Sequence, residues 1–176
     1  MPTRHFLVPV TALRKSPGSV ATEYREGPIE GLAVTGSRVP PGAVVRVDAT
    51  LTAAQDTIVV TATVRAPWLG ECRRCLAEAG GEVVASIREV YEPHTDEEET
   101  YRLTGERIDL EPLARDAVLL GLPPAPLCSE ECRGLCPTCG ADRNEGIGPA
   151  GCGCAEQPQD PRWAALDVLR TEQTPN

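Results

Sequence analysis

The stretch AVVRVDATLTAAQDTIVVTATVR, residues 43–65, alternates apolar and polar side chains in two runs joined by the polar link TAAQD. Strict alternation places every second side chain on one face of a β-strand. The apolar positions are Val45, Val47, Ala49 and Leu51 in the first run, then Ile58, Val60, Ala62 and Val64 in the second. Because a short polar link suits a hairpin, the stretch predicts two antiparallel strands that share one buried face.

Segments on both sides of this hairpin extend the predicted sheet. Residues 81–91, GEVVASIREVY, form a third alternating run with Val83, Ala85 and Ile87 on one face. RHFLVPVTAL, residues 4–13, is compatible with an edge strand, since Pro9 has no backbone N–H to donate in a central position. The sequence therefore predicts an antiparallel β-meander.

A helix is expected near residues 109–121. Asp109 can cap its first turn, Glu111 favours the positive N-terminal end, and Pro112 is tolerated there. An apolar stripe suits packing on the sheet, and its members are Leu110, Leu113, Ala114, Ala117 and Val118. The predicted fold class is α+β: an antiparallel β-meander with a packed helix and a cysteine-rich, zinc-stabilised C-terminal tail.

Length and composition limit the organisation of the chain. Its 176 residues are 41% hydrophobic, which suits one domain with an appendage. We expect a β-rich core domain at 1–127 and a cysteine-rich zinc-binding tail at 128–176, which ends in a short helix over 160–170. No signal peptide is recognisable, and the most apolar run, AVLLGLPPAP, is too short for a membrane span. These features favour a cytoplasmic protein without a membrane segment.

Eight cysteines without an export signal favour metal binding over disulfides, because thiols stay reduced in the cytoplasm. In CPTCG, Pro137 preforms a turn and Gly140 allows a tight return, so that backbone amides can point at the sulfurs. Four thiolates suit tetrahedral Zn²⁺ or an Fe–S centre. The predicted ligands of two structural Zn²⁺ ions are Cys72, Cys75, Cys128, Cys132, Cys136, Cys139, Cys152 and Cys154.

The eight thiols divide into two sets of four in two ways. In the first division, Cys136 and Cys139 join Cys152 and Cys154 across a glycine-rich link, while the pairs 72/75 and 128/132 form a site that clamps the tail to the domain. The second division makes residues 128, 132, 136 and 139 one compact site and leaves 72/75 with 152/154. Spacing alone leaves both divisions open.

Catalytic alternatives fit the sequence less well. A thioredoxin-type Cys-x-x-Cys belongs at a helix N-terminus in a βαβ setting, whereas Cys72 and Cys75 fall between two apparent strands; a thiol redox enzyme using this pair is the first alternative. A zinc deaminase needs a His-x-Glu motif, which neither His5 nor His94 provides. Closed, all-cysteine sites are structural, and the chain is expected not to be an enzyme.

Three passages in order resemble a known family: GECRRCL, then IDLEPLARDAVLLGLPPAPLC, then CRGLCPTCGADRNEG with CGC and DPRWAALDVL. With LRKSPGS near the start, they are similar to the YceD-like family, the large ribosomal RNA subunit accumulation proteins. The resemblance covers roughly residues 13–170. It implies a role in the accumulation or processing of 23S rRNA, and hence in large ribosomal subunit biogenesis.

The charge of the chain bears on its partners. A net charge of −9 lacks the basic footprint of proteins that wrap nucleic acid, which favours a ribosome-assembly protein or a pre-large-subunit particle as partner. A local contact with precursor 23S rRNA through Arg73 and Arg74 stays open. The second alternative function is a zinc-ribbon adaptor in transcription or another assembly process.

Overall fold

The structure is a computed structural model that describes residues 4–93, 101–103, 105–144, 152–154 and 162. The chain divides into two compact units, Met1–Glu131 and Cys132–Asn176. The described helices and strands all belong to the first unit, and they are η1 (Arg4–Phe6), β1 (Leu7–Pro9), α1 (Thr11–Arg14), β2 (Val20–Pro28), β3 (Ser37–Arg38), β4 (Val44–Ala54), β5 (Thr57–Glu71), β6 (Glu78–Glu92), β7 (Tyr101–Arg102), β8 (Arg107–Asp109) and α2 (Glu111–Gly121).

The main sheet has the strand order β2-β4-β5-β6-β7, and β3 pairs with β5 beyond the end of β4. Its long strands are antiparallel, and β7 adds a short parallel pairing to β6. In the β4–β5 hairpin, Val47 lies opposite Val64 and Leu51 opposite Val60. The predicted meander of three strands is therefore confirmed, with a further strand, β2, along the outer edge of β4.

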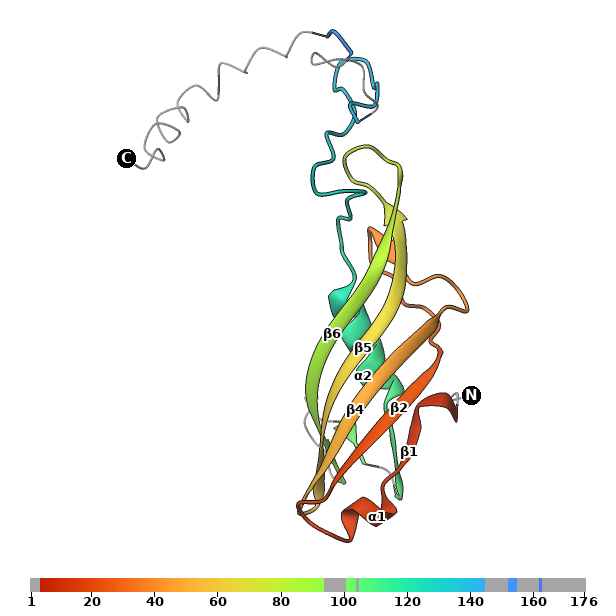
Figure 1. Ribbon diagram of the computed structural model, residues 1–176, viewed down its shortest axis with the longest axis vertical. Coiled ribbons are helices and arrows are strands. Elements are labelled where there is room, and N and C mark those ends of the chain that lie inside the picture. Colours follow the sequence, from red (N-terminus) through yellow and green to blue (C-terminus); the bar gives the residue numbers. More distant parts are fainter. Residues whose placement is uncertain (1–3, 94–100, 104, 145–151, 155–161, 163–176) are drawn as a thin grey trace, which may run out of the picture. The chain divides into compact units, whose positions relative to one another are not determined.

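One face of this sheet forms the core. The alternating apolar positions of β4 and β5 are all buried, whereas Thr50 and Thr61 between them face the other side. Helix α2 lies across β5 and β6 (Figure 1), and its whole predicted apolar stripe is buried. The predicted packing of this helix on the sheet is confirmed.

Both ends of α2 are fixed by specific contacts. At its start, the Asp109 carboxylate accepts a hydrogen bond from the Glu111 amide at 2.9 Å, although Leu110 occupies the cap position itself. At its end, a Cβ on Gly121 would lie 2.5 Å from Cγ1 of Val83 on β6. Glycine therefore lets the last turn approach the sheet more closely than another residue would allow.

The N-terminal segment does not form the edge strand of the main sheet that the sequence suggested. Its strand β1 pairs with β8 in a separate two-stranded sheet and does not join the meander, whose outer edge is β2. The pairing gives the short strand before α2 a partner, and Val10 and Ile108 are both buried there. The predicted helix over 160–170 and most of the acidic loop at 92–100 lie outside the described residues. Among the described residues, no helix is long and apolar enough to cross a membrane.

Candidate metal centres

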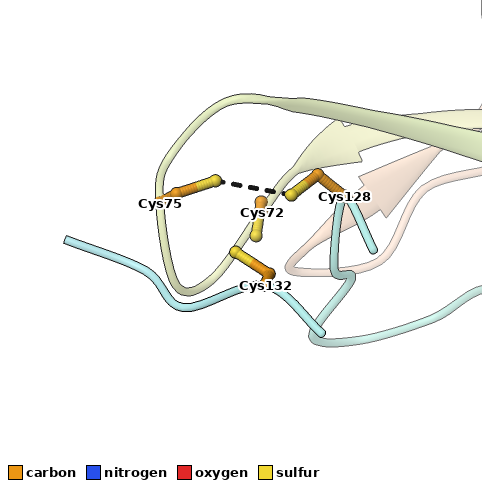
Figure 2. Close-up of side chains that lie close together, drawn as sticks. All are labelled: Cys72, Cys75, Cys128 and Cys132. Atoms are coloured by element: carbon orange, nitrogen blue, oxygen red, sulfur yellow. Dashed lines mark hydrogen bonds between the residues drawn. The ribbon is translucent and has the colours of Figure 1, made fainter. Parts of the chain in front are cut away.

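The first Cys-x-x-Cys pair lies in the tight turn that joins β5 to β6, residues 72–77, called the first knuckle below. The Cys72 amide donates to the Ala77 carbonyl at 2.8 Å, and the Leu76 amide donates to the Cys72 carbonyl at 2.9 Å. Leu76 adopts a φ of +63°, a left-handed conformation that disfavours residues with a Cβ. The turn thus reverses the chain and leaves Cys72 and Cys75 at its inner side (Figure 2).

The second Cys-x-x-Cys pair forms the same turn in residues 136–141, the second knuckle. Its Cys136 amide donates to the Ala141 carbonyl at 2.8 Å, and its Gly140 amide donates to the Cys136 carbonyl at 2.8 Å. Gly140 adopts a φ of +74°, as predicted from the CPTCG motif. The two turns share the sequence pattern Cys-x-x-Cys-x-Ala, as CRRCLA and CPTCGA. This repeat could have predicted from the sequence that the two knuckles have the same backbone turn.

Four thiols converge at the first knuckle. The Sγ atoms of Cys72, Cys75, Cys128 and Cys132 all lie within 4.8 Å of one another, and Figure 2 shows the four side chains directed toward a common centre. We call them the first cluster. Its sulfurs are mostly shielded, because Cys72 is completely buried and only Cys128 is exposed.

Hydrogen bonds hold the segment after α2 against this end of the sheet. The Ser37 hydroxyl on β3 donates to the Pro123 carbonyl at 2.7 Å, and the Arg73 amide donates to the Pro126 carbonyl at 3.0 Å. The Arg74 guanidinium donates to the Glu130 carbonyl at 3.3 Å. Through these bonds the sheet positions Cys128 next to the first knuckle, where its Sγ lies 3.5 Å from that of Cys75.

The second knuckle carries the second cluster: the Sγ atoms of Cys136, Cys139, Cys152 and Cys154 also lie within 4.8 Å of one another. This cluster is more open than the first, since Cys139 is exposed and Cys152 and Cys154 are half-buried. Of the glycines predicted to let the chain return, Gly153 is described and adopts a φ of +72°.

Backbone amides favour the thiolate form in both knuckles. Burial raises the pKa of Cys72, but hydrogen bonds from the backbone of Cys75, Cys128 and Arg74 outweigh it and lower the pKa to about 6. The backbone of Cys139 lowers the pKa of Cys136 to about 6. By contrast, side-chain hydrogen bonds with Cys152 and Cys139 raise the pKa of Cys154 to about 12.

The two clusters have the donor chemistry and the size of a tetrahedral thiolate site. Four sulfurs bound about 2.3 Å from Zn²⁺ lie about 3.8 Å from one another, which fits within the 4.8 Å spread of each cluster. None of the eight cysteines forms a disulfide, and neither cluster, as the described residues define it, contains a histidine. Two metal ions can therefore be held, and the cysteines group as in the first division of the sequence, with 72/75 beside 128/132.

The two arginines of the first knuckle are exposed. Arg73 contributes its amide, and Arg74 its guanidinium, to the segment that carries Cys128. The turn that carries them is flanked by Glu71 and Glu78, which are paired across the hairpin and exposed. The end of the hairpin therefore presents both signs of charge.

Comparison with known proteins identifies one family and several bacterial relatives. The family model described as "Large ribosomal RNA subunit accumulation protein YceD" matches residues 60–170, a range that contains all eight cysteines and α2. An uncharacterized protein of Mycobacterium tuberculosis strain H37Rv is 36% identical over 149 residues, which cover 76% of this chain and 70% of that protein. An uncharacterized protein of Mycobacterium leprae is 31% identical over 191 residues, covering 97% of this chain and 85% of its own length. No solved structure matches the chain.

Proposed function

The chain belongs to the YceD family, and from this premise we propose that it supports 23S rRNA accumulation and large ribosomal subunit biogenesis in the cytoplasm as a non-enzymatic factor. The family match over residues 60–170 is the observation that carries the proposal. In this account two structural Zn²⁺ ions, one in each cluster, stabilise the chain and present its surface to a partner.

Structural zinc is supported by the closed shape of the first cluster. Four thiolates fill a tetrahedron and leave no open position for water or substrate, which a catalytic zinc requires. The geometry also disfavours the thiol redox alternative. Cys72 sits in a β-hairpin turn with two further thiols, Cys128 and Cys132, within 4.8 Å of it and of Cys75, whereas a redox pair is placed at a helix N-terminus.

Charge favours a protein partner within the pre-large-subunit particle over extended contact with RNA. The chain carries a net charge of −9, so a long phosphate backbone would be repelled over most of its surface. Arg73 and Arg74 are exposed among acidic neighbours, a mixture that suits a protein surface or a brief contact with precursor 23S rRNA. We propose these two arginines as the contact to the partner.

Deletion and complementation in a bacterial host test the proposal. We expect loss of the protein to lower the ratio of large-subunit to small-subunit rRNA, and the wild-type chain to restore it. The chain should also crosslink to, or sediment with, pre-large-subunit particles. An unchanged rRNA ratio would contradict the proposed function, and recovery of RNA polymerase in place of these particles would favour the adaptor alternative.

The double variant Arg73→Glu/Arg74→Glu tests the contact separately. It should fail to restore the rRNA ratio. Because the Arg74 guanidinium also donates to the Glu130 carbonyl, Arg73→Glu alone, which keeps that bond, should weaken restoration as well while its zinc content stays that of the wild type. Arg88→Glu is a matched control, because Arg88 is an exposed arginine in the middle of β6. Full restoration by the double variant would refute the contact and leave the family role standing.

A further inference from the structure

Asn144 follows the second knuckle, yet its side chain reaches a sulfur of the first cluster. Its Nδ2 donates to Sγ of Cys132 at 3.4 Å. We propose that Asn144 is a positioning residue for the first metal site, and that through it the affinity of the first cluster for metal depends on the second. This inference rests on the proposed binding of metal by both clusters.

The neighbours of Asn144 determine which way its amide points. Its Oδ1 accepts a hydrogen bond from the Arg133 amide at 2.7 Å, and its Nδ2 donates to Oδ1 of Asp142 at 2.8 Å. The opposite orientation would place an N–H against an N–H and an oxygen against a carboxylate. One N–H of Nδ2 is therefore occupied by Asp142, and the other is left to point at Cys132.

A donor of this kind acts on a metal ligand from outside the coordination shell. A hydrogen bond to a ligating sulfur favours the thiolate and fixes its direction, and loss of such a partner typically lowers metal affinity by about 10–100-fold. Cys132 is buried, and the Asn144 amide supplies a hydrogen bond to its sulfur. Asn144 is accordingly expected to strengthen the first site without binding the metal itself.

The second knuckle holds Asn144 in place. Leu135 and Asp142 form a β-bridge, and the Arg143 amide donates to the Gly134 carbonyl at 2.9 Å. Within residues 132–144 and 152–154, the buried apolar side chains are Cys132 and Cys136. The hairpin therefore has little besides its cysteines to keep it folded, and loss of metal from the second cluster would release Asn144 from Cys132.

Metal titration of the full chain tests this dependence. Cadmium NMR gives one resonance for each tetrathiolate site, and Cys139→Ser identifies the second by removing it. Asn144→Ala and Asn144→Asp should each weaken the first site by about 10–100-fold in chelator competition and shift its resonance. Asn144→Asp keeps an oxygen for the Arg133 amide but removes the donor. Arg143→Ala, an exposed neighbour, should leave affinity and resonance unchanged.

A double-mutant comparison tests the link between the sites. Cys139→Ser alone should weaken the first site by a similar factor, and Asn144→Ala should add little in the Cys139→Ser background, because Asn144 is then already released. Strictly additive effects, or an unchanged first site in Asn144→Ala, would overturn the inference while two bound ions still supported the proposed zinc sites. A wild-type chain that binds no metal would instead refute the zinc proposal itself.

Discussion

The two knuckles have one backbone design on different supports. The first joins two strands of 15 residues each, whose inner faces contribute to the main core. The second lies in a segment whose described residues contribute nothing to that core. The first knuckle is thus the end of a sheet that has its own hydrophobic core. The second knuckle depends for its stability on the metal ion that its sulfurs are proposed to bind. A turn can prearrange thiols, but only the surrounding packing decides whether it persists without metal.

Metal removal should produce the largest difference in stability between the two knuckles. Structural Zn²⁺ contributes about 10–16 kcal/mol to the folding of small zinc domains, so chelation should unfold the second knuckle and spare the sheet. In hydrogen exchange, the amides of Cys136, Gly140 and Arg143 should lose protection, whereas those of the β4–β5 hairpin keep it. Equal protection of the second knuckle with and without metal would contradict its dependence on the ion.

A substitution at the left-handed position of the second knuckle should have a smaller effect on its stability. A Cβ on Gly140 would meet no atom within 4 Å, so Gly140→Leu introduces backbone strain without a clash. That strain costs about 1–2 kcal/mol, which should weaken zinc binding at the second cluster by about 5–30-fold. Thr138→Leu, at an exposed position with negative φ in the same turn, should leave affinity unchanged.

The reciprocal change, Leu76→Gly, should have the smallest effect and the opposite sign. Leu76 is 58% exposed, so its removal loses little packing while it relieves the strain of a positive φ. The gain is reduced by about 0.5–1 kcal/mol, because glycine increases the freedom of the unfolded chain. We expect a rise of a few degrees in Tm by calorimetry, at about 2–4 °C per kcal/mol. A lower Tm would mean that Leu76 is not strained.

The sequence was most informative where side chains alternate or repeat strictly. The β4–β5 hairpin was predicted because every second side chain of these strands must be apolar to reach the core. The apolar stripe of α2 was predicted because residues three or four positions apart share one face of a helix. Strand β2 was not, since its side chains are exposed or half-buried from Val20 to Glu26 and leave no alternating apolar signal. The pairing of β5 with β4 ends at Arg65, so Pro67 has no β4 residue opposite it. Strand β5 can therefore continue past this proline.

The candidate sites were predicted in part. Ligand chemistry identified all eight cysteines as a set, but the spacing allowed two divisions, because chain distance does not determine which turns meet in space. The choice depends on long-range hydrogen bonds such as that of Ser37 to Pro123, which no local pattern encodes. Asn144 was missed for the same reason: its contact with Cys132 depends on the folded hairpin.

Zinc content by native mass spectrometry of the double variant Cys128→Ser/Cys136→Ser tests the central claim most directly. The wild-type chain, purified under reducing conditions, should carry two Zn²⁺ ions. Because residues 128 and 136 belong to different clusters, the double variant should lose both ions, whereas Cys136→Ser/Cys139→Ser should keep one. Retention of one ion by Cys128→Ser/Cys136→Ser would place both residues in a single site, and a folded wild-type chain without zinc would contradict the account altogether.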